Sequence, residues 1–436
     1  MDDQPIRIIR PASRPFYEGL FKSGLIDHWS AQNDLVESHV LESTPEGGLA
    51  VKHTRIWPTS YCVEWSPSML KDAALCTLDF AIELADHRLM LQDATPWNVL
   101  FDGSQPVFVD LTSVVPGDKG LIWPAYGQFL SHFRNPLLLS HAGRGRLARQ
   151  MLFDHLNGID ETELAAAAPL RLKLRRPSIA LAATLKAQIE KRPHLQTRIR
   201  SAAAAQKLGL SPRQRTAFLK SLRRKVEGMR LSAAGNVWQD YYAGIPQDVD
   251  RQKKLDTVER VVRGIGPKSV IDLGANTGPF SVIAARAGAR TIAVDSSEPC
   301  MDTLYRLAKS ESLPITPLIA DLMSPTPAFG NFGDQFPGLL QRARSDYAFC
   351  LGLMHHLHVA GRQSFQRISD FLSRVARRGV IFEFVAMDDS NNEWISAGRE
   401  IGYDFDTVRG AIAAVFPRIE VLDSDRPTRK LLICEK

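Results

Sequence analysis

Two glycines and an acid in the C-terminal part of the chain have the spacing of a turn that passes beneath a bound nucleotide. The segment Val270-Ile-Asp-Leu-Gly-Ala-Asn-Thr-Gly278 starts as a short apolar strand that contains Asp272, and it ends in a turn that contains Gly274 and Gly278. A residue without a side chain lets the backbone approach a ligand closely. The pattern therefore predicts a strand, a ligand-binding turn and then a helix that starts near Phe280.

Two more acids follow the next two predicted strands. The segment 291–295 ends in Asp295, which lies 17 residues after Gly278, and the segment 317–321 ends in Asp321. A carboxylate in the position of Asp295 can accept hydrogen bonds from the two hydroxyl groups of a ribose. Three carboxylates after three successive strands indicate a nucleoside pocket at one edge of an α/β sheet.

Other interpretations of this pattern remain open. A dinucleotide-binding loop needs glycines in the order G-x-G-x-x-G, but position 276 is asparagine, and Gly274 and Gly278 are four residues apart. The acids could also cap helices without binding any ligand.

These residues resemble the class I S-adenosylmethionine-dependent methyltransferases over residues 250–436. The resemblance implies that Asp272, Gly274 and Gly278 enclose the methionine end of S-adenosyl-L-methionine, that Asp295 binds the ribose and that Asp321 meets the adenine amine. It also implies that Asn276, Thr277 and Leu322 contact the cofactor. Asn276 replaces the middle glycine of the commoner form of the motif.

Candidate residues for the transfer step follow the fourth and fifth predicted strands. The segment Leu351-Gly-Leu-Met-His355-His-Leu-His358 places His355 and His356 where a methyl acceptor is expected, and an imidazole can take a proton near neutral pH. Glu383 on the apolar strand Ile381–Val385 could orient an acceptor amine or act as a base. No further ligand for a metal stands beside the histidines, so no metal is expected. The Asn-Pro-Pro-aromatic motif of amino- and amide-methylating DNA and protein enzymes is missing.

A second group of polar residues lies in the N-terminal part of the chain. Asp93, Asn98 and Asp110 surround two short strands that join at Asp102-Gly103, and the set resembles the catalytic loop and metal-binding acid of protein kinases and aminoglycoside phosphotransferases. The resemblance has gaps: Leu91-Gln92 replaces the usual His-Arg, and no glycine-rich loop precedes it. We therefore expect a degenerate kinase-like region without phosphotransfer, or residues that serve only in turns and caps.

The alternation of strands and helices predicts an α/β fold with a mostly parallel sheet for the C-terminal part. The short turn Asp425-Arg-Pro-Thr428 between the last two strands predicts a terminal hairpin, and the resemblance to the methyltransferases implies a Rossmann-like sheet of seven strands with an antiparallel last strand. The strands are expected at 269–273, 291–295, 315–320, 346–351, 379–385, 418–424 and 429–435, and helices at 252–264, 279–287, 298–310 and 361–377. Three parts are expected along the chain: an α+β N-terminal domain over 1–165, a basic helical connector over 166–249 and the methyltransferase domain over 250–436. The segments 61–74 and 238–242, with the Asp93 block, also resemble a bacterial family without an assigned substrate, some of whose members are labelled nodulation-related.

Charge is distributed unevenly in this chain of 436 residues with a net charge of +6. Residues 171–230 hold 17 Lys or Arg and two acids, which leaves −9 on the rest of the chain. Phe218 is the only aromatic residue in that segment, so we favour a helical connector over a surface for single-stranded nucleic acid. Five scattered cysteines, no secretory signal and no apolar run of 18 residues predict a cytoplasmic protein without a membrane span.

The sequence thus predicts a methyltransferase for an oxygen or nitrogen atom of a small molecule or glycan intermediate. An RNA or protein methyltransferase that uses the basic segment, or a non-catalytic cofactor-binding scaffold, is the alternative.

Overall fold

The computed structural model describes residues 4–117, 123–154, 156–192, 211–231, 249–389 and 402–436. The chain forms two compact units, one of residues 1–57 and 61–232 and one of residues 58–60 and 233–436. The division into three segments expected from the sequence stays a prediction.

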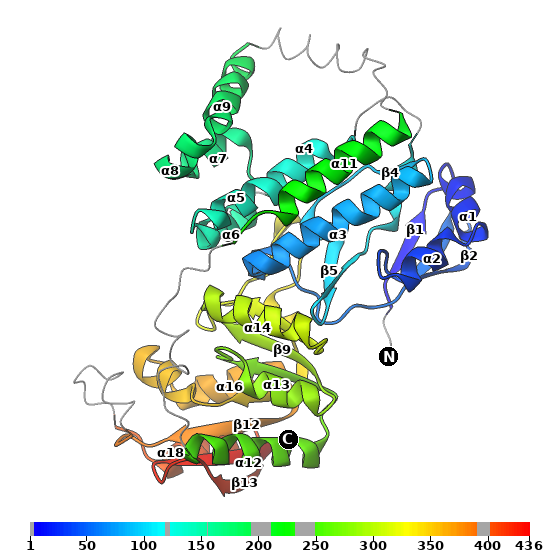
Figure 1. The fold of residues 1–436 in the computed structure, drawn as a ribbon. Coiled ribbons are helices and arrows are strands. Elements are labelled where there is room, and N and C mark those ends of the chain that lie inside the picture. The colour runs from blue at the N-terminus through cyan, green and yellow to red at the C-terminus, as the bar shows by residue number, and fades with distance from the viewer. Residues whose placement is uncertain (1–3, 118–122, 155, 193–210, 232–248, 390–401) are drawn as a thin grey trace. The chain divides into compact units, whose positions relative to one another are not determined.

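The C-terminal unit is built on one seven-stranded sheet (Figure 1). The strands are β8 (Ser269–Leu273), β9 (Arg290–Asp295), β10 (Ile315–Ile319), β11 (Ser345–Cys350), β12 (Ala376–Val385), β13 (Arg418–Asp423) and β14 (Arg429–Glu435). Their order is β10-β9-β8-β11-β12-β14-β13; the first five are parallel, and β14 runs antiparallel to both of its neighbours. This confirms the predicted Rossmann-like sheet with an antiparallel last strand, and every strand lies within a few residues of its predicted position.

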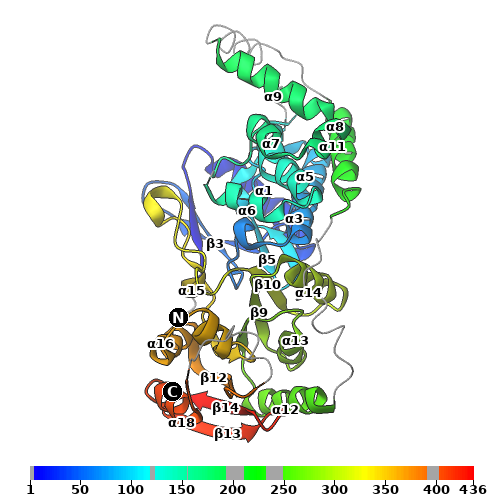
Figure 2. The ribbon, with the colours of Figure 1, turned by 90° about the vertical axis from the view of Figure 1, so that its left-hand side faces the viewer.

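Helices cover both faces of this sheet, which explains why its parallel strands are almost continuously apolar. On one face α12 (Val249–Ile265) and α13 (Pro279–Arg286) share a buried cluster with Val270, Phe349 and Ile381 of the sheet. Beside them α14 (Glu298–Ser310) packs against β9 and β10. On the other face α16 (Phe365–Val375) packs against β11 and β12, and Phe405 of α18 (Phe405–Ala413) contacts Phe384 of β12 edge to face (Figure 2).

Side-chain alternation along the strands decides which polar groups lie beneath α12 and α13. Asp272 on β8 pairs in register with Phe349 on β11, which pairs with Ile381 on β12. Residues two apart on a strand share a face, so Glu383 points to the same side as Ile381. Asp272 and Glu383 are therefore both buried beneath α12 and α13, the helices that pack in one cluster with Phe349.

The N-terminal unit is centred on the long helix α3 (Pro67–Asp86), which starts at the cap Ser66. A three-stranded antiparallel sheet of β1 (Ile6–Ile9), β3 (Leu49–His53) and β2 (Ser38–Ser43) lies in the same unit. The predicted hairpin is present as β5 (Val99–Asp102) and β6 (Gln105–Phe108), and β4 (Leu89–Leu91) pairs with β7 (Val114–Pro116). Further helices of this unit are α1 (Arg14–Lys22), α2 (Leu25–Ala31), α5 (Asn135–His141), α6 (Gly145–Asp154), α7 (Glu161–Ala167), α8 (Leu170–Arg175) and α9 (Pro177–Glu190).

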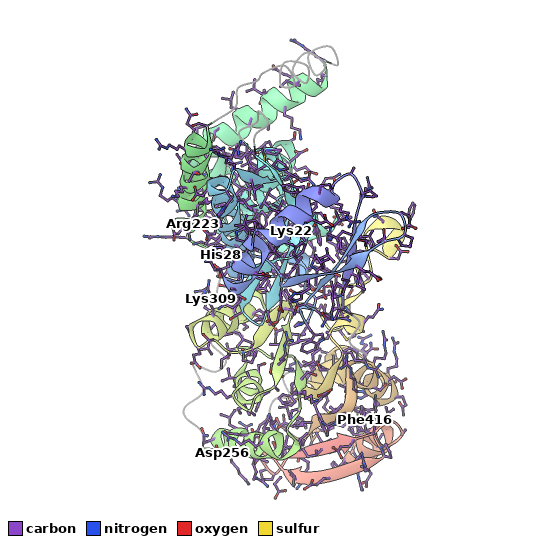
Figure 3. All side chains as sticks on the ribbon, turned by 90° about the vertical axis from the view of Figure 1, so that its right-hand side faces the viewer. Lys22, His28, Arg223, Asp256, Lys309 and Phe416 are labelled. Atoms are coloured by element: carbon purple, nitrogen blue, oxygen red, sulfur yellow. The ribbon has the colours of Figure 1, made fainter. Side chains whose placement is uncertain are left out.

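Part of the basic segment packs against this unit. Helix α11 (Pro212–Glu227) starts at the cap Ser211, as the Ser-Pro pair predicts, and lies along α3. Arg223, labelled in Figure 3, forms an ion pair with Asp79 of α3. Lys71 of α3 donates to the backbone carbonyls of Glu227 and Met229 at 2.7 and 3.0 Å. The segment 238–242, which carries part of the resemblance to the nodulation-related family, lies outside the described residues.

Candidate functional site

The turn after β8 has the backbone geometry that its glycines predict. Gly274 and Gly278 have φ angles of +71° and +79°, in the left-handed region that a side chain disfavours. A Cβ atom on Gly278 would lie 2.5 Å from the δ carbons of Leu304. Gly278 also stands as the N-cap of α13, so the turn passes directly into the helix. Neither glycine has room or backbone freedom to be replaced by a larger residue.

Asp295 closes this turn from the end of β9. Its Oδ2 accepts the backbone N–H of Asn276 at 2.9 Å, and its Oδ1 accepts the backbone N–H of Ser297 at 2.8 Å. Burial raises the pKa of Asp295, and the N–H donors oppose that rise. Each oxygen keeps a second lone-pair direction, so the half-buried carboxylate can still accept two hydroxyl donors.

Asn276 and Thr277 complete the turn. Asn276 has a left-handed φ of +51°, and its Oδ1 accepts the backbone N–H of Thr277 at 2.6 Å. The same oxygen lies 3.4 Å from the thiol of Cys300 on α14. The asparagine therefore holds the turn in shape at the position where a third glycine is commoner.

Asp272 lies deeper than its neighbours. It is 2% exposed and accepts the hydroxyl of Ser281 on α13 at 2.6 Å. Burial raises the pKa of Asp272 to about 6, with a smaller contribution from the charge of Asp295. The carboxylate thus fastens β8 to the helix that follows the turn.

Asp321 and Leu322 lie just after β10, at the same edge of the sheet. Asp321 is exposed and accepts the backbone N–H of Met323 at 2.9 Å, while Leu322 is half-buried. Because β8, β9 and β10 are parallel neighbours, their carboxyl ends are adjacent. The structure therefore brings Asp272, Asp295 and Asp321 to one edge, as the sequence predicts.

The histidines after β11 differ in their surroundings. His355 is 2% exposed, and its Nδ1 is buried without a hydrogen-bond partner among the described residues. Its ring lies 4.4 Å from that of His356, centroid to centroid. Burial lowers the pKa of His355 to about 3, and burial also lowers the pKa of His356. Both imidazoles are therefore neutral at pH 7.

The third histidine of this segment has a structural position. His358 Nδ1 donates to the backbone oxygen of Gln363 at 2.7 Å, and its ring stacks on Phe365 with the centroids 4.0 Å apart. These contacts fix the turn that leads into α16.

Glu383 is fully buried and forms a paired network. Its Oε2 accepts Lys254 Nζ of α12 at 2.6 Å, and its Oε1 accepts the hydroxyl of Ser424 at 2.7 Å. Burial alone would raise the pKa of Glu383, but Lys254 and then Arg429 outweigh it and hold the pKa below its ordinary value. Glu383 is therefore an ionised carboxylate with a hydrogen bond to each oxygen.

A second buried ion pair stands beside the first. Arg429 donates from Nε and Nη2 to the two oxygens of Asp389 at 2.8 and 3.0 Å, and Thr428 donates to the same carboxylate at 2.8 Å. Both charged side chains are less than a tenth exposed. The pair fastens the loop after β12 to the start of β14. Its two charges also act on His355, where Arg429 lowers the pKa and Asp389 raises it.

The roles of Lys254, Arg429, Asp389 and Ser424 were not predicted from the sequence. Lys254 gave a usable signal, because it lies four residues before Val258 and eight before Val262 on the buried stripe of α12. A lysine on a buried stripe needs an acid opposite, and Glu383 is that acid. Asp389 lies in a polar loop and gave no comparable signal.

The N-terminal group of polar residues is joined by hydrogen bonds within the protein. Asp110 accepts Arg7 Nη1 at 2.7 Å and also the hydroxyls of Thr112 and Ser113. Asn98 donates to Ser113, and Asp93 accepts Gln128 Nε2 at 2.9 Å. In the described part of the chain no group of three or more His, Cys, Asp or Glu could hold a metal ion. The kinase-like character of this region is not confirmed.

The chain was compared with known proteins. No protein-family profile matches it. It is 28% identical over 375 residues to the nodulation protein NoeA of Rhizobium meliloti, an alignment that covers 81% of this chain and 75% of that protein.

Solved structures resemble parts of the chain. The magnesium protoporphyrin IX methyltransferase of Synechocystis PCC 6803 with bound S-adenosylhomocysteine matches 46% of this chain and 92% of its own, with 18% identity and a TM-score of 0.32. The bifunctional kinase-methyltransferase WbdD matches 47% of this chain and 43% of its own, with 16% identity and a TM-score of 0.33. An O-methyltransferase family protein from Burkholderia thailandensis matches 42% and 55%, with 11% identity and a TM-score of 0.34. These TM-scores are low, so the assignment of the fold rests on the strand order of the sheet itself.

Removing either partner of the Lys254–Glu383 pair should strongly destabilise the C-terminal unit. Lys254→Met and Glu383→Gln each leave a buried group without its partner, at a cost of about 3–5 kcal/mol in the free energy of unfolding. The double variant should lose about 0.5–3 kcal/mol less than the two single losses together. Urea unfolding measures all three, with the exposed pair Lys430–Asp423 as the matched control. Additive losses at Lys254 and Glu383 would show that the two charges are not coupled.

His355 should make stability depend on pH in a defined direction. The folded state keeps His355 neutral down to about pH 3, whereas an unfolded histidine takes up a proton near its ordinary pKa of about 6.5. The unfolded state therefore binds more protons in this window, and stability falls as the pH is lowered through it. His355→Gln should remove up to about 2 kcal/mol of that loss between about pH 6.5 and pH 5. Equal pH slopes for both proteins in chemical denaturation would contradict the buried, neutral state.

Proposed function

We propose that this protein is an S-adenosylmethionine-dependent methyltransferase that acts on an oxygen or nitrogen atom of a small molecule or glycan intermediate. One observation carries the proposal. A glycine turn with left-handed backbone at Gly274 and Gly278 lies at the sheet edge where the carboxylates of Asp295 and Asp321 also stand. A nucleoside with a charged amino-acid tail matches such a combination of close backbone and acceptor oxygens.

The residues at this edge fit the cofactor. The turn from Gly274 to Gly278, with Asn276 and Thr277, would hold the methionine end, because backbone without side chains can lie against it. Asp295 would bind the ribose with the lone pairs that its two N–H donors leave free. Asp321 is exposed and Leu322 is half-buried, which suits a polar contact and an apolar contact with adenine.

The cofactor supplies an electrophilic methyl group on a sulfonium. The protein must align the acceptor with it, exclude water and take a proton from an acceptor that carries one. His355 is proposed as the proton acceptor, because its buried Nδ1 has no partner among the described residues. Since burial lowers its pKa to about 3, the bound ligands must raise that pKa for His355 to act as a base. His356 lies against it and is proposed to share this wall of the site.

Glu383 is proposed to act by position. Lys254 and Ser424 already bind its two oxygens, and the side chain is fully buried, so a methyl acceptor does not reach it. Its charge keeps Lys254 in place beneath the turn, where the ammonium also lies 5.1 Å from the ring centroid of Phe280. The buried pairs Lys254–Glu383 and Arg429–Asp389 are proposed to keep the elements beneath the site rigid while ligands bind and leave.

Cofactor binding should depend on Asp295. Asp295→Ala removes a charged acceptor of two hydroxyl groups and should weaken binding of S-adenosylhomocysteine by about ten- to a hundred-fold. Isothermal titration calorimetry measures this, and Asp423→Ala, which removes an exposed carboxylate from β13, is the matched control. Equal affinities of wild type and Asp295→Ala would remove Asp295 from the cofactor site.

Transfer itself is tested with radiolabelled methyl groups. The protein is incubated with S-adenosyl-L-methionine labelled on its methyl group and an extract of the source cells, and the extract is then separated into small molecules and glycans, protein and RNA. Label should enter the first fraction and fall at least about a hundred-fold with His355→Gln, because general-base contributions are about 10²–10⁴-fold. Label in the RNA or protein fraction would instead support the polymer-methylating alternative. Cofactor binding without any transfer would support a cofactor-binding scaffold.

A further inference from the structure

Four leucines on the neighbouring helices α8 and α9 have their side chains in solvent. Leu170, Leu174, Leu181 and Leu185 are 70%, 73%, 62% and 51% exposed. We call these four residues the leucine face. They lie at the periphery of the N-terminal unit, where α8 and α9 pack on each other and α9 packs on α7 (Figures 1 and 2). Single exposed leucines are ordinary, but four on two consecutive helices form a patch.

Helix geometry explains how α8 presents its part of the patch. Leu170 and Leu174 are four residues apart and share the outer side, while Leu172 points the other way and is 5% exposed. Arg171 and Arg175, also four apart, flank the outer leucines on one side, and Lys173 flanks them on the other. The helix therefore has an apolar centre between two rows of cations.

Helix α9 repeats the arrangement without the flanking charge. Ile179 and Ala183 are buried toward the rest of the unit, and Leu181 and Leu185 point away from it. Lys186 on this helix is paired with Asp160 at 2.6 Å. Leu181 and Leu185 thus add two exposed leucines on a helix that packs against α8.

The charges that the sequence places on α8 and α9 have one sign except for Glu190, the last residue of α9, and the acids Glu161 and Glu163 lie on α7, which packs against α9. From residue 164 to residue 189 the sequence contains five Lys or Arg and no Asp or Glu. Arg171, Lys173, Arg175 and Arg176 form no ion pair with any residue that the structure describes. A complementary partner must therefore offer anionic groups next to an apolar region.

We propose that α8 and α9 bind the surface of an anionic lipid bilayer. Leucines at the centre of a helix with Lys and Arg beside them can enter the boundary between headgroups and acyl chains while the cations meet lipid phosphates. Neither helix is long and apolar enough to cross a bilayer, and the same holds for every helix in the described ranges. A nucleic acid would match the cations but not the leucines, and residues 164–189 contain no aromatic side chain to stack on bases.

Sedimentation of the full chain with vesicles tests this inference. The vesicles contain phosphatidylcholine alone, or phosphatidylcholine with roughly one third phosphatidylglycerol, a content high enough to attract juxtamembrane cations. The protein should bind the second kind at least about tenfold more strongly, and binding should weaken with added salt. Equal binding to both kinds, or to neither, overturns the proposal.

Two pairs of variants separate the leucines from the cations. Leu174→Glu with Leu181→Glu, and Arg171→Glu with Arg175→Glu, should each reduce binding to anionic vesicles at least about tenfold. The controls are Ile6→Glu, at a position 59% exposed on β1, and Arg224→Glu with Lys225→Glu on α11, and these should bind like wild type. Loss of binding in the controls would mean that net charge alone drives it and would overturn the proposal.

Two further measurements distinguish other occupants of the leucine face. Concentration-dependent dimerisation in analytical ultracentrifugation that Leu174→Glu with Leu181→Glu abolishes would assign the face to a second copy of the chain. Binding of transfer RNA that Arg171→Glu with Arg175→Glu abolishes while the leucine variants retain it would assign the cations to nucleic acid. Either result without vesicle binding overturns the lipid proposal.

Discussion

The buried pair of Lys254 and Glu383 is the constraint on which the C-terminal unit depends. It joins α12 to β12 across the face of the sheet that also holds Asp272. Two charges are taken from water here, which costs several kcal/mol per ion unless each is paired. Ser424 binds the second oxygen of Glu383, and Arg429 with Asp389 forms a neighbouring pair, so every charge in the group is compensated. An apolar core would have been simpler to stabilise, but the pairs fix the relative positions of α12, β12 and β14 with hydrogen-bond accuracy.

Because α12, β12 and β14 are fixed in this way, the loops at the edge of the sheet can keep the geometry of a binding site. Parallel neighbours β10, β9 and β8 end together, and the carboxylates after them share one edge. Asp295 binds the N–H of Asn276 and so sets the turn between Gly274 and Gly278 in the geometry that a close ligand requires. On the other side of β8, the loop after β11 places His355 in a buried, neutral state. Cofactor binding and proton transfer are thus proposed for the loops after β8, β9, β10 and β11. The buried ion pairs that join α12, β12 and β14 support these loops.

Local sequence patterns were sufficient to predict the individual strands and helices of the C-terminal unit. Strands such as Ser269–Leu273 and the helix Glu298–Ser310 follow from apolar runs and cap residues that lie within a few positions of one another. The glycines and acids of the turn are recognisable because they follow strands directly. The pairing of Lys254 with Glu383 spans 129 positions, and that of Arg429 with Asp389 spans 40, so no local pattern encodes either. In the N-terminal unit the Asp102-Gly103 pair indicated the hairpin correctly, but no local pattern revealed that Arg7, from the first strand, would pair with Asp110.

The central claim is that the edge formed by the turn, Asp295 and Asp321 binds S-adenosylmethionine and its demethylated product. A crystal structure of the protein grown with S-adenosylhomocysteine tests it most directly. The account predicts both ribose hydroxyls within hydrogen-bond distance of the Asp295 carboxylate, the homocysteine end against the backbone of Gly274–Gly278 and the adenine beside Asp321 and Leu322. A ligand bound elsewhere, or a ribose that leaves the Asp295 oxygens bonded only to the N–H groups of Asn276 and Ser297, would contradict it.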